Sequence, residues 1–488
     1  IRPKGTFRMV DAAKSARTPV ELSKPQKAAA VAMGAFLMGA LWRFRGEHGY
    51  GASWGLLTCG MVFLLLVFAV FGFRRKAGFL LYSLTAAAFM LSTPGWGTLN
   101  GQITGILESG VAGGDGQQIR VFINPLSGLF MMLCLGFGLA AVFAFLLGRF
   151  FSDRPYGFKD MAVVLAVYFA VKYATRAALS PAILQLAQPQ AVDLFALGLQ
   201  KAGVAGTPWQ VYLQHSFDHA WAKDIHGGRN YFTSINTISS AITSLAVWLT
   251  MRFALKDRTG ARIMLGICAA FAFAITLADL SLFFANGGYR MQHTYDLLYK
   301  LSGWGMWEYF TGFFAGGLLM LIFVCLPFDR LAVGAQAEEP FTADMPGWLY
   351  GILNFIVTLG LCFSSTLVRP IASRYEDTVY HIPLYAGLSA VFLIVMLLVT
   401  LKWGAGLRGV DFRRFCVYAL PFFFTAHVCI YMFAGTQDMQ HFRHTGDIAN
   451  KLVLTSFAVF CLLYPFVFHR GGVRQRSTGR RQNPKAEI

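Results

Sequence analysis

The residues best suited to chemistry lie in a short polar stretch between two apolar runs, residues 43–55, which read RFRGEHGYGASWG. Glu47 beside His48 is a combination that transfers protons near neutral pH. Arg43 and Arg45 carry the planar guanidinium fork that recognises phosphate or carboxylate. We therefore expect Glu47 and His48 to be catalytic and the two arginines to bind substrate.

Other residues of this kind lie within apolar runs or at their edges. Unpaired charge there is costly, so such side chains pair with one another or line a wet cavity. The positions of Arg176, Asp279, Glu308 and His427 along the runs predict similar depths in the outer half of a membrane, around a vestibule that opens outward and is capped by the outer loops. A purely structural ion network fits the buried charges equally well. The expected catalytic residues are Glu308 and Asp279, and the expected substrate-binding residues are Arg176, His427, Arg443, His444 and Trp304.

The elements that must position these residues are membrane-spanning helices. Of the 488 residues, 56% are hydrophobic and only 14% are charged, whereas a soluble domain has about 25% charged residues. Apolar runs of about 18–25 residues, the length that crosses a bilayer as helix, recur along the chain. The fold class predicted is all-α, a polytopic integral membrane bundle of about 12 transmembrane helices. The predicted spans are 28–43, 53–73, 77–96, 125–149, 160–187, 235–255, 262–285, 304–327, 347–368, 383–401, 415–434 and 451–468.

The distribution of positive charge predicts the orientation. With the N-terminus placed in the cytoplasm, roughly two thirds of the 42 lysines and arginines fall on the cytoplasmic side, as the positive-inside rule requires. We expect a basic cytoplasmic tail over 1–27, one transmembrane domain over 28–469 and a second basic cytoplasmic tail over 470–488. The net charge of +18 then reflects topology and contact with anionic membrane lipids rather than nucleic acid. The expected location is the plasma (inner) membrane.

Two long loops are expected outside the membrane, 97–124 and 188–234. The first, which contains a run of glycines, predicts irregular structure. The second has apolar residues at helical spacing around 208–221, which predicts an amphipathic roof helix along the extracytoplasmic surface. With this topology, eight of the ten histidines fall on the outer side: His48, His215, His219, His226, His293, His381, His441 and His444.

His215 and His219 are spaced as two ligands on one helix face would be, and His226 is a possible third ligand. Ser216 stands where the HExxH motif has its glutamate, so that motif is absent. We therefore predict no metal site and keep these histidines as weak candidates. No cofactor is indicated. The eight cysteines all fall in apolar runs and predict no disulfide framework.

These observations favour a membrane transferase that acts at the extracytoplasmic leaflet on a lipid-linked or envelope glycan. The layout is similar to that of polyprenol-linked glycan ligases and polymerases, without a shared motif. A phosphate-bearing glycan and membrane lipids are the expected partners. The alternatives are a secondary transporter of a small polar or anionic solute, for which intramembrane charges such as Lys172 are natural, and a non-catalytic subunit of an envelope complex. Few ionisable residues line the inner halves of the spans, which favours the enzyme.

Overall fold

The part of the chain that the structure describes is helical almost throughout. The structure is a computed structural model. Long apolar runs account for the helices, because a chain in a bilayer must satisfy its backbone hydrogen bonds within each segment. The described residues are 22–45, 52–71, 78–91, 105–109, 119–152, 154, 156–216, 218–282, 304–326, 345–373, 379, 381–403, 406–407, 412–433 and 448–468.

Within these ranges, nine helical segments are long and apolar enough to cross a membrane, and a bent pair would make a tenth. The chain is therefore an all-α, multi-pass membrane protein, as predicted. The nine segments are α2 (Lys24–Arg45), α3 (Ala52–Phe71), α8 (Phe158–Ala174) with its continuation, α13 (Gly228–Leu249) with η2 (Thr250–Ala254), α14 (Arg258–Leu282), α16 (Trp304–Cys325), α21 (His381–Trp403), α22 (Phe412–Phe433) and α24 (Ile448–Phe468).

Several predicted spans are not single regular helices. The predicted span 125–149 is a pair of helices bent by 48°, because the backbone at Ala140 leaves the helical conformation. Elsewhere the chain continues through π-helical turns, which insert an extra residue into a helix. Two of them are η1 (Thr175–Leu179) and η4 (Phe355–Val368). The remaining shorter α-helices in the spans are α4 (Gly78–Phe89), α6 (Pro125–Leu139), α7 (Ala141–Phe150), α9 (Ser180–Ala187), α19 (Gly347–Asn354) and α20 (Arg369–Ser373).

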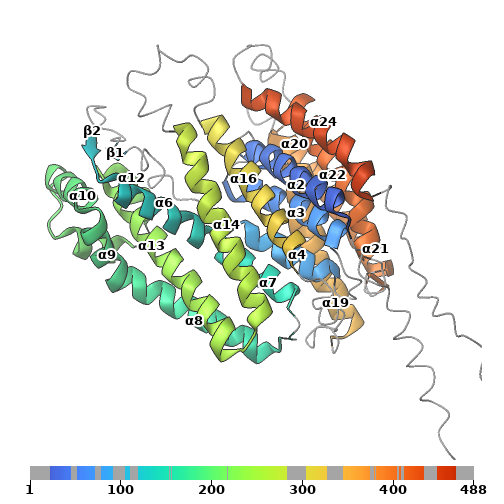
Figure 1. The fold of residues 1–488 in the computed structure, drawn as a ribbon, viewed down its shortest axis with the longest axis horizontal. Coiled ribbons are helices and arrows are strands. Elements are labelled where there is room, and N and C mark those ends of the chain that lie inside the picture. Colours follow the sequence, from blue (N-terminus) through green and yellow to red (C-terminus); the bar gives the residue numbers. More distant parts are fainter. Residues whose placement is uncertain are drawn as a thin grey trace, which may run out of the picture.

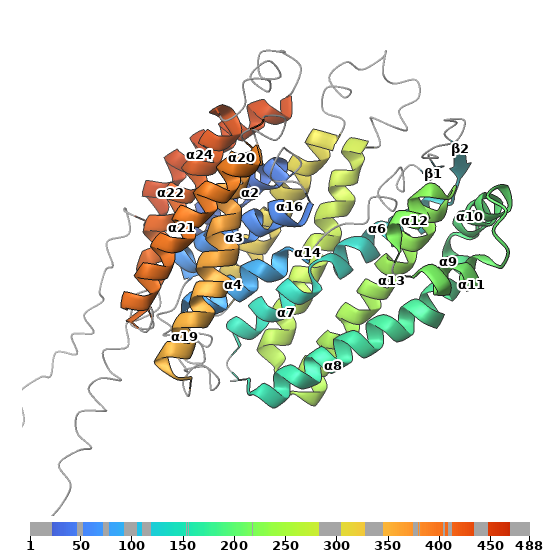
Figure 2. The same ribbon diagram turned by 180° about the vertical axis from the view of Figure 1, so that it is seen from behind.

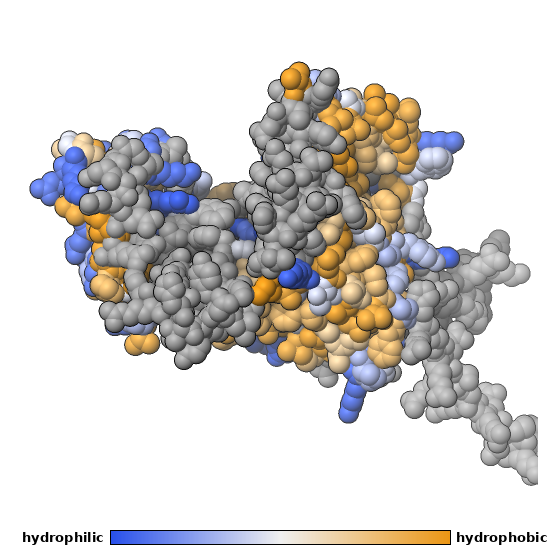
Figure 3. Space-filling view, turned by 90° about the horizontal axis from the view of Figure 1, so that it is seen from above, coloured by the Kyte–Doolittle hydropathy of each residue, from blue (hydrophilic) through white to orange (hydrophobic). Residues whose placement is uncertain are grey.

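The helices form a bundle and an arm (Figures 1 and 2). In the bundle, α2, α3 and α16 lie centrally, with α21, α22 and α24 on one side and α14 on the other. The arm consists of α8 and α13, which run side by side away from the bundle. Figure 3 shows apolar side chains over the region where α24 lies and hydrophilic side chains at the opposite end, near α10 (Pro189–Lys201).

The tightest packing in the bundle joins α2 to α16, and two glycines of α16 make it possible. A Cβ atom at Gly312 would meet the Met38 carbonyl oxygen, and one at Gly316 would meet the Gly34 carbonyl oxygen. Two small residues four positions apart are typical of such close helix packing. Residues on the facing sides of α2 and α16 are thereby held within reach of one another.

The two long loops differ from their predictions. Loop 97–124 is not wholly irregular, because β1 (Ile106–Ser109) and β2 (Ile119–Phe122) pair as an antiparallel hairpin. Loop 188–234 holds short helices instead of one roof helix. Besides α10 they are α11 (Pro208–His215) and α12 (His219–Asp224). The Asp218 carboxylate accepts the Trp221 backbone N–H at 2.9 Å, which starts a new helix where the periodicity predicted a continuous one.

The turn that follows η2 is fastened to the loop that follows α7. The Tyr156 hydroxyl donates to Asp257 Oδ2 at 2.7 Å, and the Gly260 backbone N–H donates to Asp257 Oδ1 at 2.7 Å. Asp257 thereby caps α14 and holds Tyr156 at the same time. Burial, with the Asp257 charge beside it, raises the pKa of Tyr156 above its ordinary value, so the phenol remains a donor.

Candidate functional site

Two cations lie in the last turn of α2, Arg43 and Arg45, and both are buried. The position suits them, because the C-terminal end of a helix carries partial negative charge. A buried guanidinium also needs a specific partner, since desolvation of an isolated charge is costly.

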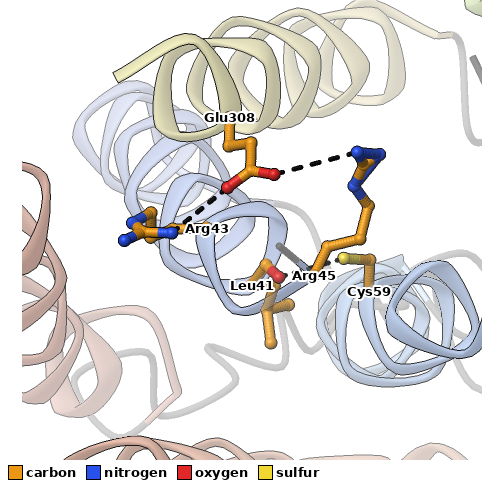
Figure 4. A network of polar contacts seen from close by, with 5 residues as sticks. All are labelled: Leu41, Arg43, Arg45, Cys59 and Glu308. Carbon is orange, nitrogen blue, oxygen red and sulfur yellow. Dashed lines mark hydrogen bonds and ion pairs between the residues drawn. The ribbon is translucent and has the colours of Figure 1, made fainter. Parts of the chain in front are cut away.

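The partner is Glu308, in the first turns of α16 (Figure 4). Its Oε2 lies 3.2 Å from Arg43 Nη1, and its Oε1 lies 3.8 Å from Arg45 Nη2. Each carboxylate oxygen thus faces a different arginine. Gly312 stands one turn beyond Glu308, where α16 touches α2, so the helix packing sets these distances. We call Arg43, Arg45 and Glu308 the arginine–glutamate cluster.

Two tryptophans flank Arg45. Its Cζ lies 5.6 Å from the centroid of the Trp42 ring and 5.8 Å from that of Trp307, within the range of cation–π attraction. Both indoles are fully buried. The Arg45 guanidinium is therefore held in position by two rings as well as by Glu308. Trp304 begins α16, but its side chain lies outside the described residues.

A third helix supports the end of α2. The Cys59 thiol, on α3, donates to the Leu41 carbonyl at 3.1 Å (Figure 4). The contact fixes α3 against the turn that carries the arginines. All eight cysteines are free thiols.

Asp279 and His427 are both buried, on helices of the same bundle. Asp279 lies near the C-terminal end of α14, which packs along α16. His427 lies on α22, one turn before Tyr431, whose ring centroid is 4.7 Å from that of Phe44. Phe44 stands between the two arginines in the sequence, so this contact brings α22 to the end of α2.

Arg176 is not brought to the cluster. It lies in η1, in the arm, and its Nε donates to the Tyr212 hydroxyl at 3.0 Å. The views in Figures 1 and 2 agree that α14 separates this part of the arm from α2 and α16. Burial raises the pKa of Tyr212, and the adjacent Arg176 opposes that shift. Arg176 and Glu308 therefore do not line a single vestibule.

Four predicted site residues lie outside the described residues: Glu47, His48, Arg443 and His444. In the sequence, Glu47 and His48 follow Arg45 by two and three residues.

The weak metal candidates do not share a helix. α11 ends at His215, and α12 begins at His219. The His215 ring stacks on Trp221 instead, with centroids 3.9 Å apart, while His226 is buried after α12. Among the described residues, no group of three or more His, Cys, Asp or Glu side chains is arranged to hold a metal ion.

Sequence reasoning overlooked the polar face of α13. Lys172 Nζ donates to Ser240 Oγ at 2.8 Å, and the hydroxyls of Thr175 and Ser239 lie 2.9 Å apart. The signal was present in the sequence, because Ser, Thr and Asn recur at close intervals over residues 230–244. The prediction of a span over 235–255 considered only the apolar residues around them.

Comparison with known proteins adds no identification. No protein-family model, curated protein or solved structure matches the chain.

Proposed function

We propose that the chain is an integral membrane transferase that acts at the extracytoplasmic leaflet on a lipid-linked or envelope glycan. In this proposal it crosses the plasma membrane twelve times and keeps both termini in the cytoplasm. Within the described ranges, nine long spans, the bent pair and two shorter apolar helices, Phe79–Phe89 and Gly347–Thr358, support that count. The short helices α11 and α12 take the place of the predicted roof helix.

The observation that carries the proposal is the arginine–glutamate cluster. Two buried guanidiniums lie on either side of one carboxylate. A guanidinium fork matches the oxygens of phosphate or carboxylate. A phosphate-linked sugar carrier supplies that anion next to a leaving group.

Each part of the centre has a role in the proposed reaction. Arg43 and Arg45 hold the substrate phosphate or carboxylate. Glu308 organises the arginines rather than acting as the base, because each of its carboxylate oxygens already faces a guanidinium. Glu47 and His48 transfer the proton. Buried Asp279 and His427 complete the surroundings of the centre, and Trp304, Arg443 and His444 contact the glycan.

The test is comparative mass spectrometry of envelope lipids and glycans from cells with and without the gene. We expect one defined group to be lost from an outer-leaflet molecule in the deletion strain. Wild-type protein should restore it, and the Glu308→Gln variant should not. An unchanged set of envelope molecules would overturn the proposal.

A secondary transporter is the second candidate, and a charged side chain within a span favours it. Such side chains mark solute pathways in membrane proteins, and the α8–η1–α9 rod carries Lys172 midway along its length, where its ammonium group donates to Ser240 on α13. Proteoliposome uptake separates the candidates. Accumulation of one solute with an unchanged envelope identifies a transporter, and an altered envelope molecule without uptake identifies the transferase.

A further inference from the structure

Lys172 and Arg176 form a second concentration of positive charge, in the arm and away from the arginine–glutamate cluster. They stand one turn apart on a continuous apolar rod, Phe158–Ala187. At 1.5 Å per residue the rod is about 45 Å long, longer than the roughly 30 Å hydrocarbon core. Lys172 lies midway along it, and Arg176 lies one turn nearer to α11, which it contacts through Tyr212.

Lys172 and Arg176, the lysine–arginine pair, both donate hydrogen bonds to neutral groups. Lys172 Nζ donates to Ser240 Oγ at 2.8 Å. Arg176 donates from Nε to the Tyr212 hydroxyl at 3.0 Å and from Nη2 to the Ser216 carbonyl at 2.6 Å. Within the described ranges, no carboxylate forms an ion pair with Lys172. Two cations this close repel at low dielectric, and an anion between them would relieve that repulsion.

The surroundings offer further hydrogen-bonding groups. The Thr175 and Ser239 hydroxyls, 2.9 Å apart, lie on the facing sides of the two arm helices. A hydroxyl both donates and accepts, so it can adapt to anion oxygens. The π-helix that begins at Thr175 leaves the Ala177 carbonyl to accept the Trp209 indole N–H at 2.8 Å. π-Helical turns occur frequently at functional sites, and this contact joins α11 to η1.

The outer face of the rod shows where a ligand would come from. Phe169 and Tyr173, on either side of Lys172 in the sequence, are exposed, and so is Leu179 beyond Arg176. Exposed apolar side chains at membrane depth contact lipid chains. An amphiphile can therefore lie along this face with its head group at the lysine–arginine pair.

We propose that Lys172 and Arg176 bind a phosphate anion between α8, α13 and α11, and that the head group of an anionic phospholipid supplies it. The proposal is independent of the transferase, which rests on Arg43, Arg45 and Glu308. Occupancy of this site would fix the arm helices to one another and α11 to η1 at the same time.

The experiment is native mass spectrometry of the full-length protein in detergent, titrated with phosphatidic acid or with phosphatidylcholine. Lys172→Gln removes the charge, and Lys172→Arg keeps it. Lys159→Gln, an exposed change near the start of the same helix, is the matched control. Melting followed by a thiol-reactive dye checks that each variant is folded. Inorganic phosphate is titrated by calorimetry in a separate arm.

We expect wild-type protein to bind phosphatidic acid about tenfold or more tightly than phosphatidylcholine. Lys172→Gln should lose that preference, because the loss of a hydrogen bond to a charged group weakens binding by about this factor. Lys172→Arg and Lys159→Gln should retain it. Binding of inorganic phosphate without a preference for phosphatidic acid would keep the anion site but overturn the lipid as its source. Equal binding of both lipids by folded wild type and Lys172→Gln, with no phosphate binding, would overturn the whole proposal.

Discussion

At the scale of single residues, Glu308 holds the site together because its two oxygens face two buried arginines. Glu308→Gln removes the negative charge and with it the ion pairs that Glu308 forms with Arg43 and Arg45. We expect the free energy of unfolding to fall by about 3 kcal/mol, the usual cost of breaking a buried ion pair from one side. Thermal unfolding in detergent, followed by the reaction of buried thiols with a maleimide dye, measures the change.

Thr311→Val is the matched control, one turn from Glu308 on α16. The Thr311 hydroxyl is buried and has no hydrogen-bond partner among the described residues. Its removal should leave stability unchanged or raise it, because an unsatisfied buried polar group is itself costly. Equal destabilisation by both variants would mean that any substitution in this region lowers stability and that the ion pairs contribute no more to it than other contacts do.

Residue types could be chosen from the sequence, but their pairing could not. The sequence indicates Arg43, Arg45 and Glu308 because an unpaired charge at the edge of an apolar run is energetically costly. Arg43 and Glu308 are 265 residues apart in the sequence, and no local pattern specifies which helices become neighbours. Arg176 illustrates the limit, because its similar predicted depth gave no indication that it lies in the arm.

At the scale of elements, the contact between α2 and α16 positions the cluster. Gly312→Ala would place a Cβ against the Met38 carbonyl and the Trp42 Cβ, so the helices must separate. We expect about 1–3 kcal/mol of destabilisation and loss of activity together. Gly387→Ala on α21 is the control, since nothing lies within 4 Å of its added Cβ. Wild-type activity and stability in Gly312→Ala would contradict this packing.

The Tyr156–Asp257 contact fastens the loop after α7 to the start of α14. Tyr156→Phe should cost about 1.5–3 kcal/mol, as expected for a hydrogen bond to a charged group, whereas exposed Tyr418→Phe should cost under about 0.5 kcal/mol. Melting temperatures in detergent compare the two variants. If they are equal, the hydrogen bond contributes nothing measurable.

The same contact predicts a dependence on pH. The folded protein raises the pKa of Tyr156, so it binds the phenolic proton more tightly than the unfolded chain does. The stabilisation is therefore present below about pH 10 and declines as the pH rises above that value. Tyr156→Phe should remove this part of the alkaline decline, and an identical decline in wild type and variant would contradict the assignment.

Apolar run length predicted the helices well, because a bilayer leaves a spanning segment few other ways to satisfy its backbone. The interruptions were not predicted. No proline in the sequence indicates the bend at Ala140. The expected roof helix is divided where the Trp221 backbone N–H donates to Asp218. Both depend on local hydrogen bonding, which hydrophobic periodicity does not record.

At the scale of the whole molecule, charge distribution predicts both tails in the cytoplasm and α10–α12 outside. Alkaline phosphatase fused after Gly203, in the turn between α10 and α11, should be active in a bacterial host. Green fluorescent protein fused after residue 488 should fluoresce. If the two reporters are exchanged between these positions, neither should give a signal. Signals only from the exchanged reporters would place the proposed site on the cytoplasmic side.

The most direct test of the central claim separates the fold from anion binding. Replacing a buried ionic cluster entirely by apolar residues of similar volume is often neutral or stabilising. The triple variant Arg43→Leu, Arg45→Met, Glu308→Leu should therefore melt near the wild-type temperature. Mass spectrometry of the envelope of deletion cells that express this folded variant is the decisive measurement. We predict that the product restored by wild-type protein is absent. Full restoration would show that the cluster is structural and would contradict its role in binding substrate.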